Sequence, residues 1–353
     1  MRPHWPLPGL SLGLGVGLLA LPLLLQHLGQ APVRMFSQGL LYVLLALGLN
    51  VVVGFAGLLD LGFVAFYALG AYVFALAASP HLFEHFAWVQ ASFPAGLHAP
   101  WWLLLPASAV LAAGLGCLLG APTLRLRGDY LAVVTLAFGE LIRLLLNNLG
   151  HPANLTNGAR GISQIDDLQI AGLHFGRPLD LFAGVRLAPV TLHAYLFLVL
   201  VLLALLICVR LDDSRLGRAW KALREDEMAA QAMGLDTHRL KLLAFAVGAG
   251  FGGVAGCLFA EFQGYVSPES FSLQESVLIV AMVVLGGSGH VPGVVLGALL
   301  LSVLPEALRY LTGPLQAWSD GRLDAAILRQ LLVAVVMVGV MLWRPRGLWP
   351  GKG

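Results

Sequence analysis

Ten apolar runs, spread over nearly the whole chain, constrain this protein more than any other feature of its sequence. A helix of about 20 residues crosses a bilayer, because the hydrocarbon core is about 30 Å thick and each residue adds about 1.5 Å. The runs predict transmembrane helices at 9–28, 35–53, 62–79, 101–120, 129–149, 189–209, 242–262, 272–288, 292–305 and 327–343. We therefore expect an all-α polytopic membrane protein, with residues 1–353 forming one transmembrane domain.

The composition agrees with a membrane protein. Hydrophobic residues make up 58% of the chain and charged residues only 11%, whereas soluble domains carry about 25% charged residues. So few charges cannot cover a surface that faces water. The formal net charge of +2 produces no field that would attract nucleic acid.

The distribution of Lys and Arg predicts the orientation. An even number of spans places both termini on one side, and Lys and Arg are concentrated in the loops on that side. Cytoplasmic loops carry an excess of these residues. Both termini are therefore predicted to be cytoplasmic.

Two polar segments separate the apolar runs. Segment 150–188 is a long loop on the outer side, and segment 210–241 is the most charged part of the chain, on the cytoplasmic side. The spacing of apolar residues divides segment 210–241 into two short helices, the second closed by Gly234, because glycine favours the left-handed conformation of a helix C-terminus. A short amphipathic helix below the membrane is typical of a docking element. The alternative is an ordinary solvated loop that carries the positive-inside charge.

Glycines gather at two junctions between predicted helices. They lie between the second and third helices and between the eighth and ninth, which suggests a weak internal repeat. Glycine allows broken helices and close backbone packing around a transport path, although small-residue helix packing alone would use the same residues. The glycines are Gly54, Gly57 and Gly62 at the first junction, and Gly286, Gly287, Gly289 and Gly293 at the second.

Ionisable residues inside a membrane are costly and mark candidate functional positions. Glu140, Arg143 and Asn147 share one helical face near mid-membrane, and we expect that face to look into the bundle and either line a path, gate it or lock helices together. Asp60 is expected to cap the start of the third helix. Asn50 is a candidate for a hydrogen bond between helices. No catalytic or metal site is predicted.

Four segments together resemble a known family. They read LGLNVVVGFAGLLDLG at 47–62, GDYLAVVTLAFGE at 128–140, and VLGGSG at 284–289 followed by Pro292 and Gly293. The fourth is similar to the coupling motif of ATP-binding-cassette (ABC) importer permeases, Glu-Ala-Ala followed three residues later by Gly. It is carried here by Glu227, Ala229, Ala230 and Gly234, preceded by Arg224, Glu225 and Asp226. Together, and in the order in which they occur along the chain, these segments resemble the LivM-type permease of branched-chain amino acid importers.

The resemblance implies a transport subunit of the bacterial inner membrane that is not itself an enzyme. Its implied partners are a LivH-type second permease, two cytoplasmic ATPase subunits that hold ATP and Mg, and a periplasmic amino-acid-binding protein; no cofactor is expected on this chain. Residues 224–234 would couple the ATPases to the helices. Two alternatives remain: a permease for urea or short amides, and a stand-alone secondary transporter that uses Glu140 for proton coupling.

Overall fold

The computed structural model describes residues 8–93, 97–124, 126, 128–151, 154–170, 173–180, 186–318, 325–344 and 347–349. Ten long helices account for most of this part of the chain, and each coincides with one predicted apolar run. They are α1 (Pro8–Leu28), α2 (Gln30–Leu49), α3 (Val64–Ala77), α6 (Trp101–Thr123), α7 (Asp129–Asn148), α8 (Pro189–Asp212), α11 (Thr237–Gln263), α12 (Leu273–Gly286), α13 (Val291–Trp318) and α14 (Ala325–Trp343).

The remaining elements are short. Helices α4 (His81–His85) and α5 (Ala87–Ser92) follow α3, and α9 (Arg215–Glu225) and α10 (Glu227–Ala232) form the two helical units predicted in segment 210–241. Helix α2 continues into a π-helical turn, η1 (Asn50–Phe55), and two 3-10 turns follow at η2 (Gly158–Arg160) and η3 (Pro268–Phe271). Helix α13 runs past the predicted end at residue 305 to Trp318.

Within the described residues, five helical stretches are both long and apolar enough to cross a membrane. They are Gln30–Phe55, Trp101–Thr123, Pro189–Asp212, Thr237–Gln263 and Val291–Leu308. Helices α3 and α12 are shorter, at 14 residues each. At about 1.5 Å per residue each of them reaches about 21 Å, less than the hydrocarbon thickness. The chain is therefore a multi-pass membrane protein that combines helices long enough to cross the bilayer with two shorter ones, α3 and α12.

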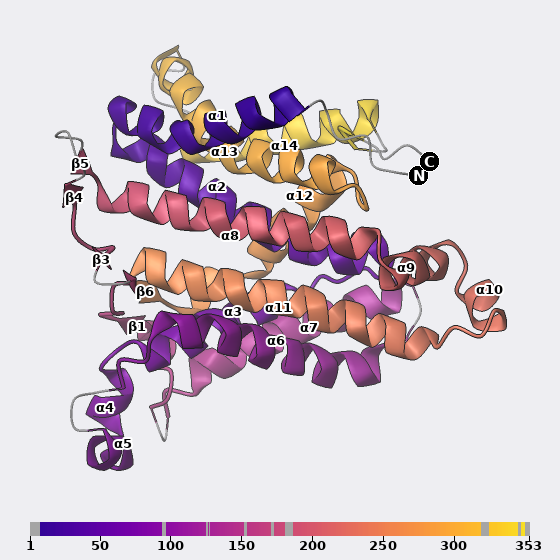
Figure 1. Cartoon of the computed structure of the whole chain (residues 1–353), viewed down its shortest axis with the longest axis horizontal. Helices are drawn as coiled ribbons and strands as arrows, with labels where there is room; N and C mark the ends of the chain where they lie inside the picture. The colour runs from indigo at the N-terminus through magenta and orange to yellow at the C-terminus, as the bar shows by residue number, and fades with distance from the viewer. Residues whose placement is uncertain are drawn as a thin grey trace.

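The long helices form a bundle around α11. Helix α11 packs against α6, α3 and α2, and α2 also packs against α8 and α13 (Figure 1). Helices α9 and α10 project from one end, where α1 begins and α14 ends. The first described residues of α1 and the last residues of α14 therefore lie at the same end of the bundle as α9 and α10.

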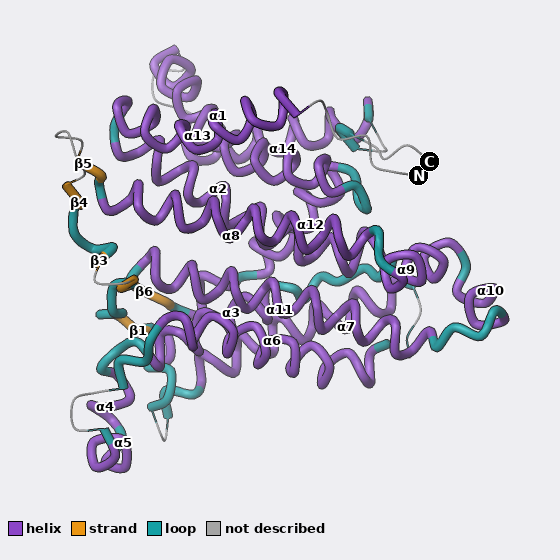
Figure 2. The backbone as a smooth tube through the Cα atoms, in the orientation of Figure 1, coloured by secondary structure: helices purple, strands orange, loops and turns teal. Residues whose placement is uncertain are grey.

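Three two-stranded ladders lie at the opposite end of the bundle (Figure 2). Two are local hairpins within the outer loop, β2 (Gln169–Ile170) with β3 (Leu173–His174) and β4 (Leu179–Asp180) with β5 (Arg186–Leu187). The third joins distant segments, because β1 (Ile162–Ser163) pairs antiparallel with β6 (Tyr265–Val266), just after α11. The outer loop is thereby hydrogen-bonded to the chain that leads into α12.

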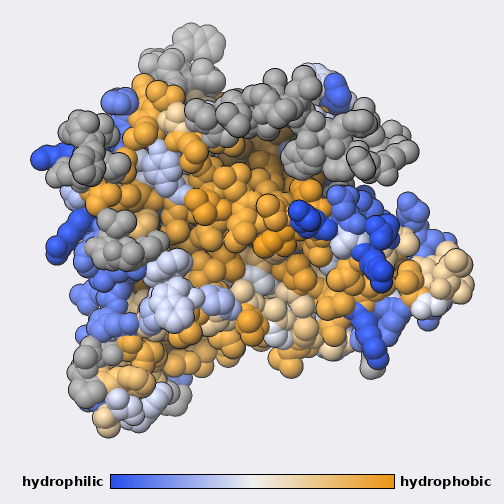
Figure 3. All heavy atoms as spheres, in the orientation of Figure 1, coloured by the Kyte–Doolittle hydropathy of each residue, from blue (hydrophilic) through white to orange (hydrophobic). Residues whose placement is uncertain are grey.

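Apolar side chains cover the middle of the bundle, and polar side chains gather at its two ends (Figure 3). Large apolar residues of the membrane helices, such as Val110, Leu118 and Val133, are exposed. In water such exposure would be unfavourable, but against lipid it costs nothing. The surface therefore agrees with the membrane assignment drawn from composition.

Candidate functional site

The two glycine junctions predicted from the sequence meet in space. The side-chain oxygen Oδ1 of Asn50, in η1, accepts a hydrogen bond of 2.8 Å from the backbone N–H of Gly289, between α12 and α13. A Cβ added to Gly54 would overlap the Asn50 side chain and would lie 2.5 Å from the Gly289 nitrogen. Glycine is therefore required here for backbone-to-backbone contact. The sequence predicts that Asn50 forms a hydrogen bond between helices. Its observed partner, Gly289, lies in the junction between α12 and α13 rather than in a helix.

Arg224, at the end of α9, reaches this contact from the cytoplasmic segment. Its Nη1 donates a hydrogen bond of 2.5 Å to the carbonyl oxygen of Gly54. A Cβ added to Gly57 would lie 2.7 Å from Cγ of Arg224, and one added to Gly289 would lie 2.6 Å from its Nη1. The positive φ of Gly57 and of Gly289 also disfavours any other residue there. The side chain of Arg224, which belongs to the segment predicted to couple to the ATPases, thus contacts both glycine junctions.

The second junction is itself closely packed. A Cβ added to Gly286 would overlap the carbonyl oxygen of Gly293, and one on Gly293 would overlap that of Gly286. Gly287, the residue directly after α12, has φ +108°. The backbone N–H of Leu348 donates to the carbonyl oxygen of Leu285 at 2.8 Å. These glycines allow α12 and α13 to touch along their backbones, so the small-residue packing interpretation describes Gly286 and Gly293.

The chain between η1 and α3 is held against α7 and α12. The backbone N–H of Leu61 donates to Oγ1 of Thr135 at 3.1 Å, and Oγ of Ser276 donates to the Leu61 carbonyl at 2.5 Å. A Cβ on Gly62 would overlap the Thr135 carbonyl oxygen. These bonds tie the loop before α3 to two helices, α7 and α12.

The prediction that Asp60 caps α3 is wrong. Helix α3 begins at Val64, and Phe63 precedes it without a side-chain cap. Asp60 is fully buried, and its Oδ1 instead accepts a hydrogen bond of 2.9 Å from the N–H of Gly62. The carboxylate therefore shapes the loop, since it lies too far before α3 to reach its first free N–H groups.

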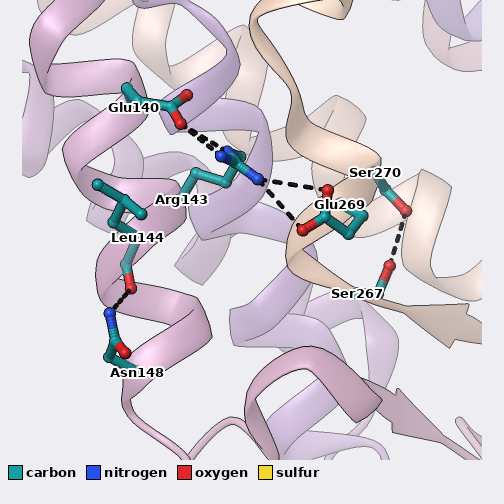
Figure 4. Close-up of polar contacts among 7 residues, drawn as sticks. All are labelled: Glu140, Arg143, Leu144, Asn148, Ser267, Glu269 and Ser270. Carbon is teal, nitrogen blue, oxygen red and sulfur yellow. Dashed lines mark hydrogen bonds and ion pairs between the residues drawn. The ribbon is translucent and has the colours of Figure 1, made fainter.

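The polar face of α7 forms an ion-pair cluster (Figure 4). Glu140 Oε1 accepts from Nε and Nη2 of Arg143 at 3.0 Å and 2.5 Å. Nη1 of Arg143 points across to Glu269, in η3, and lies 3.2 Å and 3.3 Å from its two carboxylate oxygens. Glu140 and Arg143, which share one helical face as predicted, form an ion pair. The Glu140 side chain is 40% exposed in this chain, so this part of the face is only partly enclosed by the bundle.

Two cavities border this face of α7. The outer one has a volume of about 610 Å³ and is lined by polar residues, among them Asn147, Asn154, Asn157 and Arg160. The inner one has a volume of about 70 Å³ and is lined by Leu61, Val64, Leu136, Gly139, Glu140, Phe271 and Leu273. The inner cavity touches the N-terminal ends of the two shorter helices, α3 and α12. Glu140 and Asn147 therefore belong to different cavities on one helix face.

Segment 210–241 is a folded element attached to α11. Trp220 is fully buried and donates its indole N–H to the Leu240 carbonyl at 2.8 Å. Asp226 caps α10 by accepting from the N–H groups of Met228 and Ala229 at 2.8 Å and 3.0 Å. These contacts exclude an unstructured solvated loop.

The C-terminus of α10 is closed as predicted. Gly234 has φ +84°, and its N–H and that of Leu235 donate to the carbonyls of Gln231 and Ala230. This is the paired bonding of a Schellman motif. Ala230 is buried against the segment, while Ala229 is exposed beside Met228 and Met233, whose exposed fractions are 68% and 84%. Glu225 is exposed as well. The end of α9 and the helix α10 therefore together present an exposed tip, acidic at Glu225 and apolar at Met228 and Met233.

Glu227 has a structural partner that the sequence did not reveal. Its Oε1 lies 2.5 Å from Nζ of Lys241, whose side chain is only 6% exposed. Sequence reasoning also missed Glu269, Thr135 and Ser276. A local signal existed only for Glu269, an acidic residue just before an apolar run; the other contacts depend on distant segments that come together on folding.

A family model described as "Branched-chain amino acid transport system / permease component" matches residues 31–341, which include every junction described above. The chain belongs to this family. Its similarity to curated members is distributed over most of its length. LivM of Escherichia coli (strain K12), a high-affinity branched-chain amino acid transport system permease protein, is 45% identical over 88% of this chain and 68% of its own.

More distant family members also match this permease. The probable branched-chain amino acid transport permease protein LivM of Methanocaldococcus jannaschii is 28% identical over 69% of this chain and 67% of its own. LivH of Escherichia coli (strain K12) is 26% identical over 77% of this chain and 82% of its own. No solved structure matches the chain.

Proposed function

We propose that this chain is one of two permease subunits of an ATP-driven importer that moves leucine, isoleucine and valine across the bacterial inner membrane. The relatives named LivM support the substrate class. The similarity to LivH supports a second, homologous permease as partner. Ten spans, cytoplasmic termini and a single permease domain over residues 1–353 complete the proposal.

The contact of Arg224 with Gly54 is the observation that carries the mechanism. Two cytoplasmic ATPase subunits would hold ATP and Mg, and one of them would bind α9 and α10. Movement of α9 would displace the guanidinium that lies against Gly54, Gly57 and Gly289. Because the two glycine junctions touch each other, one displacement would act on α2, α3, α12 and α13 together.

The outer side would receive substrate from a periplasmic binding protein. The ladders of segment 150–188 and the outer cavity lie at the end of the bundle opposite α9 and α10. The glycine junctions would act as the inner closure and the α7 face as part of the path. This chain would hold no catalytic residue, metal or cofactor of its own.

Reconstitution tests the proposal. The chain is co-expressed with a LivH-type permease, the two ATPase subunits and the binding protein, and ATP-dependent uptake of labelled leucine into proteoliposomes is measured. We expect uptake that requires every component. Activity of the chain alone, driven by a proton gradient, would instead show a secondary transporter, and uptake of urea or acetamide in place of leucine would show an amide importer.

The contacts of Glu140 weigh against proton coupling. A residue that shuttles protons must be free to change partners, but the Glu140 carboxylate is held by two guanidinium nitrogens of Arg143. Charge-assisted bonds of this kind are among the stronger hydrogen bonds in proteins. The described cluster is therefore better suited to holding charge than to carrying a proton.

A further inference from the structure

The polar face of α7 borders both cavities. Asn147 lines the outer cavity and Glu140 lines the inner cavity. The seven residues between these positions span about 10 Å along a helix, and Arg143 lies between them on the same face. Asn147 Oδ1 is buried without a hydrogen-bond partner among the described residues. Anything that passes from the outer to the inner cavity along this face meets Arg143.

The segment Tyr265–Phe271 forms the opposite wall along the same line. The Tyr265 hydroxyl donates to the carbonyl of Arg160, at the outer cavity, at 3.0 Å. Glu269 pairs with Arg143, and Phe271 lines the inner cavity. Figure 4 shows the Arg143 guanidinium extending from α7 to this segment. The Arg143–Glu269 pair is therefore the contact that joins the two walls between the cavities.

The two cavities differ in what they can hold. A volume of about 610 Å³ lies in the range of small-molecule sites. The inner volume of about 70 Å³ holds roughly two water molecules, since one water takes about 30 Å³. The outer cavity can thus admit an amino acid while the inner one cannot. Arg143 lies between the two cavities on α7 and lines neither of them.

The cluster at this level carries one cation and two carboxylates. Arg143 is 23% exposed, whereas Glu269 is 67% exposed and so more accessible to water. An ion pair with an exposed partner is worth little and exchanges readily. The uncompensated negative charge would in turn attract an ammonium group.

We propose that Arg143, Glu140 and Glu269 form an outer gate that opens by exchanging partners with a zwitterionic α-amino acid. The substrate carboxylate replaces Glu269 on the Arg143 guanidinium, and its ammonium group pairs with the released Glu269 or with Glu140. This inference rests on the proposed function and adds which groups of the substrate the gate recognises, namely its carboxylate and its ammonium group.

The chemistry favours a zwitterion over a neutral amide. The guanidinium fork matches a carboxylate with two parallel hydrogen bonds. An incoming carboxylate replaces Glu269 on Arg143 while Glu140 stays bound, so the guanidinium keeps two acidic partners throughout the exchange. Urea or acetamide brings no charge with which to replace Glu269. The gate therefore opens for amino acids and stays closed for neutral amides.

The outer loop is connected to this gate. Ser163 of β1 lies opposite Tyr265 of β6, four residues before Glu269. A force on segment 150–188 is carried by this ladder into the wall that holds Glu269. A binding protein that docks on the outer loop would thus act on the same ion pair that the substrate exchanges.

The gate is tested by the accessibility of the inner cavity in the complete reconstituted complex. Leu136→Cys places a thiol in that cavity, and a membrane-impermeant methanethiosulfonate is added outside. We expect Glu269→Gln to raise the labelling rate about fivefold, which corresponds to about 1 kcal/mol for an exposed pair. Asn148→Ala is the matched control, because Asn148 lies on α7 but donates only to the carbonyl of Leu144. Equal labelling in the wild-type, Glu269→Gln and Asn148→Ala backgrounds would overturn the proposal.

Uptake of leucine gives the second measurement. We expect Arg143→Gln to lower uptake about tenfold or more, because it removes a charged, two-pronged donor. Arg143→Lys, which keeps the charge but lacks the fork, should recover only part of it. Unchanged uptake in Arg143→Gln would also overturn the gate. If the wild-type complex transports no amino acid, the proposed function fails; if it transports leucine and these variants behave like wild type, only the gate fails.

Discussion

The Nη1 atom of Arg224 lies 2.5 Å from the carbonyl oxygen of Gly54, and this hydrogen bond joins residues 170 positions apart. It links the cytoplasmic helix α9 to the point where Gly54 and Gly289 touch. The bond thus connects the part of the chain that faces soluble partners with both breaks between membrane helices. If this hydrogen bond is lost, movement of α9 should no longer be transmitted to the membrane helices.

Arg224→Ala should lower leucine uptake about tenfold or more while ATP hydrolysis continues. The variant removes a hydrogen bond from a charged donor, which is worth about 1.5–3 kcal/mol. Uptake and ATPase rates are measured on the same proteoliposomes. Arg218→Ala is the control on the same helix, because Arg218 donates to the Asp213 carbonyl within its own segment. Parallel loss of both rates in Arg224→Ala would instead point to an assembly defect.

Gly54→Ala should prevent the two junctions from touching. The added methyl group would overlap Asn50 and lie against the Gly289 nitrogen, and overpacking of this kind costs about 1–3 kcal/mol. We expect a lower melting temperature in detergent and loss of uptake. Gly114→Ala, in α6, meets nothing within 4 Å and should leave the protein as stable or up to about 1 kcal/mol more stable. Wild-type stability and uptake in Gly54→Ala would refute the requirement for contact.

Glu227→Gln should destabilise the cytoplasmic segment. Lys241 is almost completely buried and Glu227 is its partner at 2.5 Å, so the variant leaves a buried ammonium group without its counter-charge. Because Glu227 itself is about one third exposed, we expect a cost of about 1–2 kcal/mol rather than the full penalty for a buried pair. Faster proteolysis near residues 226–236 is the measurement. Lys241→Met together with Glu227→Gln should restore resistance, and failure to do so would argue against the pair.

Met228→Asp and Met233→Asp should weaken binding of the ATPase subunits without unfolding the chain. Both side chains are largely exposed at the tip of α10, where an apolar surface has no lipid to cover it. Co-purification of the ATPases with the permease pair measures the effect. Glu225→Lys tests the acidic part of the same tip. It is easier to interpret than a change at Glu227, because Glu227 pairs with the buried Lys241 and a change there would also destabilise the segment. Wild-type recovery of ATPases in all three variants would place the docking surface elsewhere.

Much of the fold could be predicted from local pattern. Each of the ten predicted runs coincides with a long helix, because a helix in lipid satisfies its own backbone hydrogen bonds and is recognised by its length and hydropathy alone. The end of α10 at Gly234 was predictable for a similar reason, since a left-handed residue is a local requirement. The number of helices that cross the membrane stays a prediction.

The candidate site was only partly predictable. Sequence pattern found Gly54, Gly289 and Arg224 separately, as members of two junctions and a charged segment, but nothing in it placed them together. It found Glu140 and Arg143 as neighbours on one helix turn, yet not Glu269, which is 126 residues from Arg143. It assigned Asp60 to the start of a helix that in fact begins at Val64.

The sequence alone determined where the chain forms helices, that these helices belong in a membrane, and which end of the bundle carries the charge. Those properties follow from runs of neighbouring residues, whose hydrophobicity and backbone preferences act over one or two helical turns. Only the tertiary structure decided that Arg224 contacts both glycine junctions and that Arg143 joins α7 to the segment before α12. Such contacts depend on how distant helices pack, and packing is decided by backbone approach and side-chain shape over the whole bundle at once.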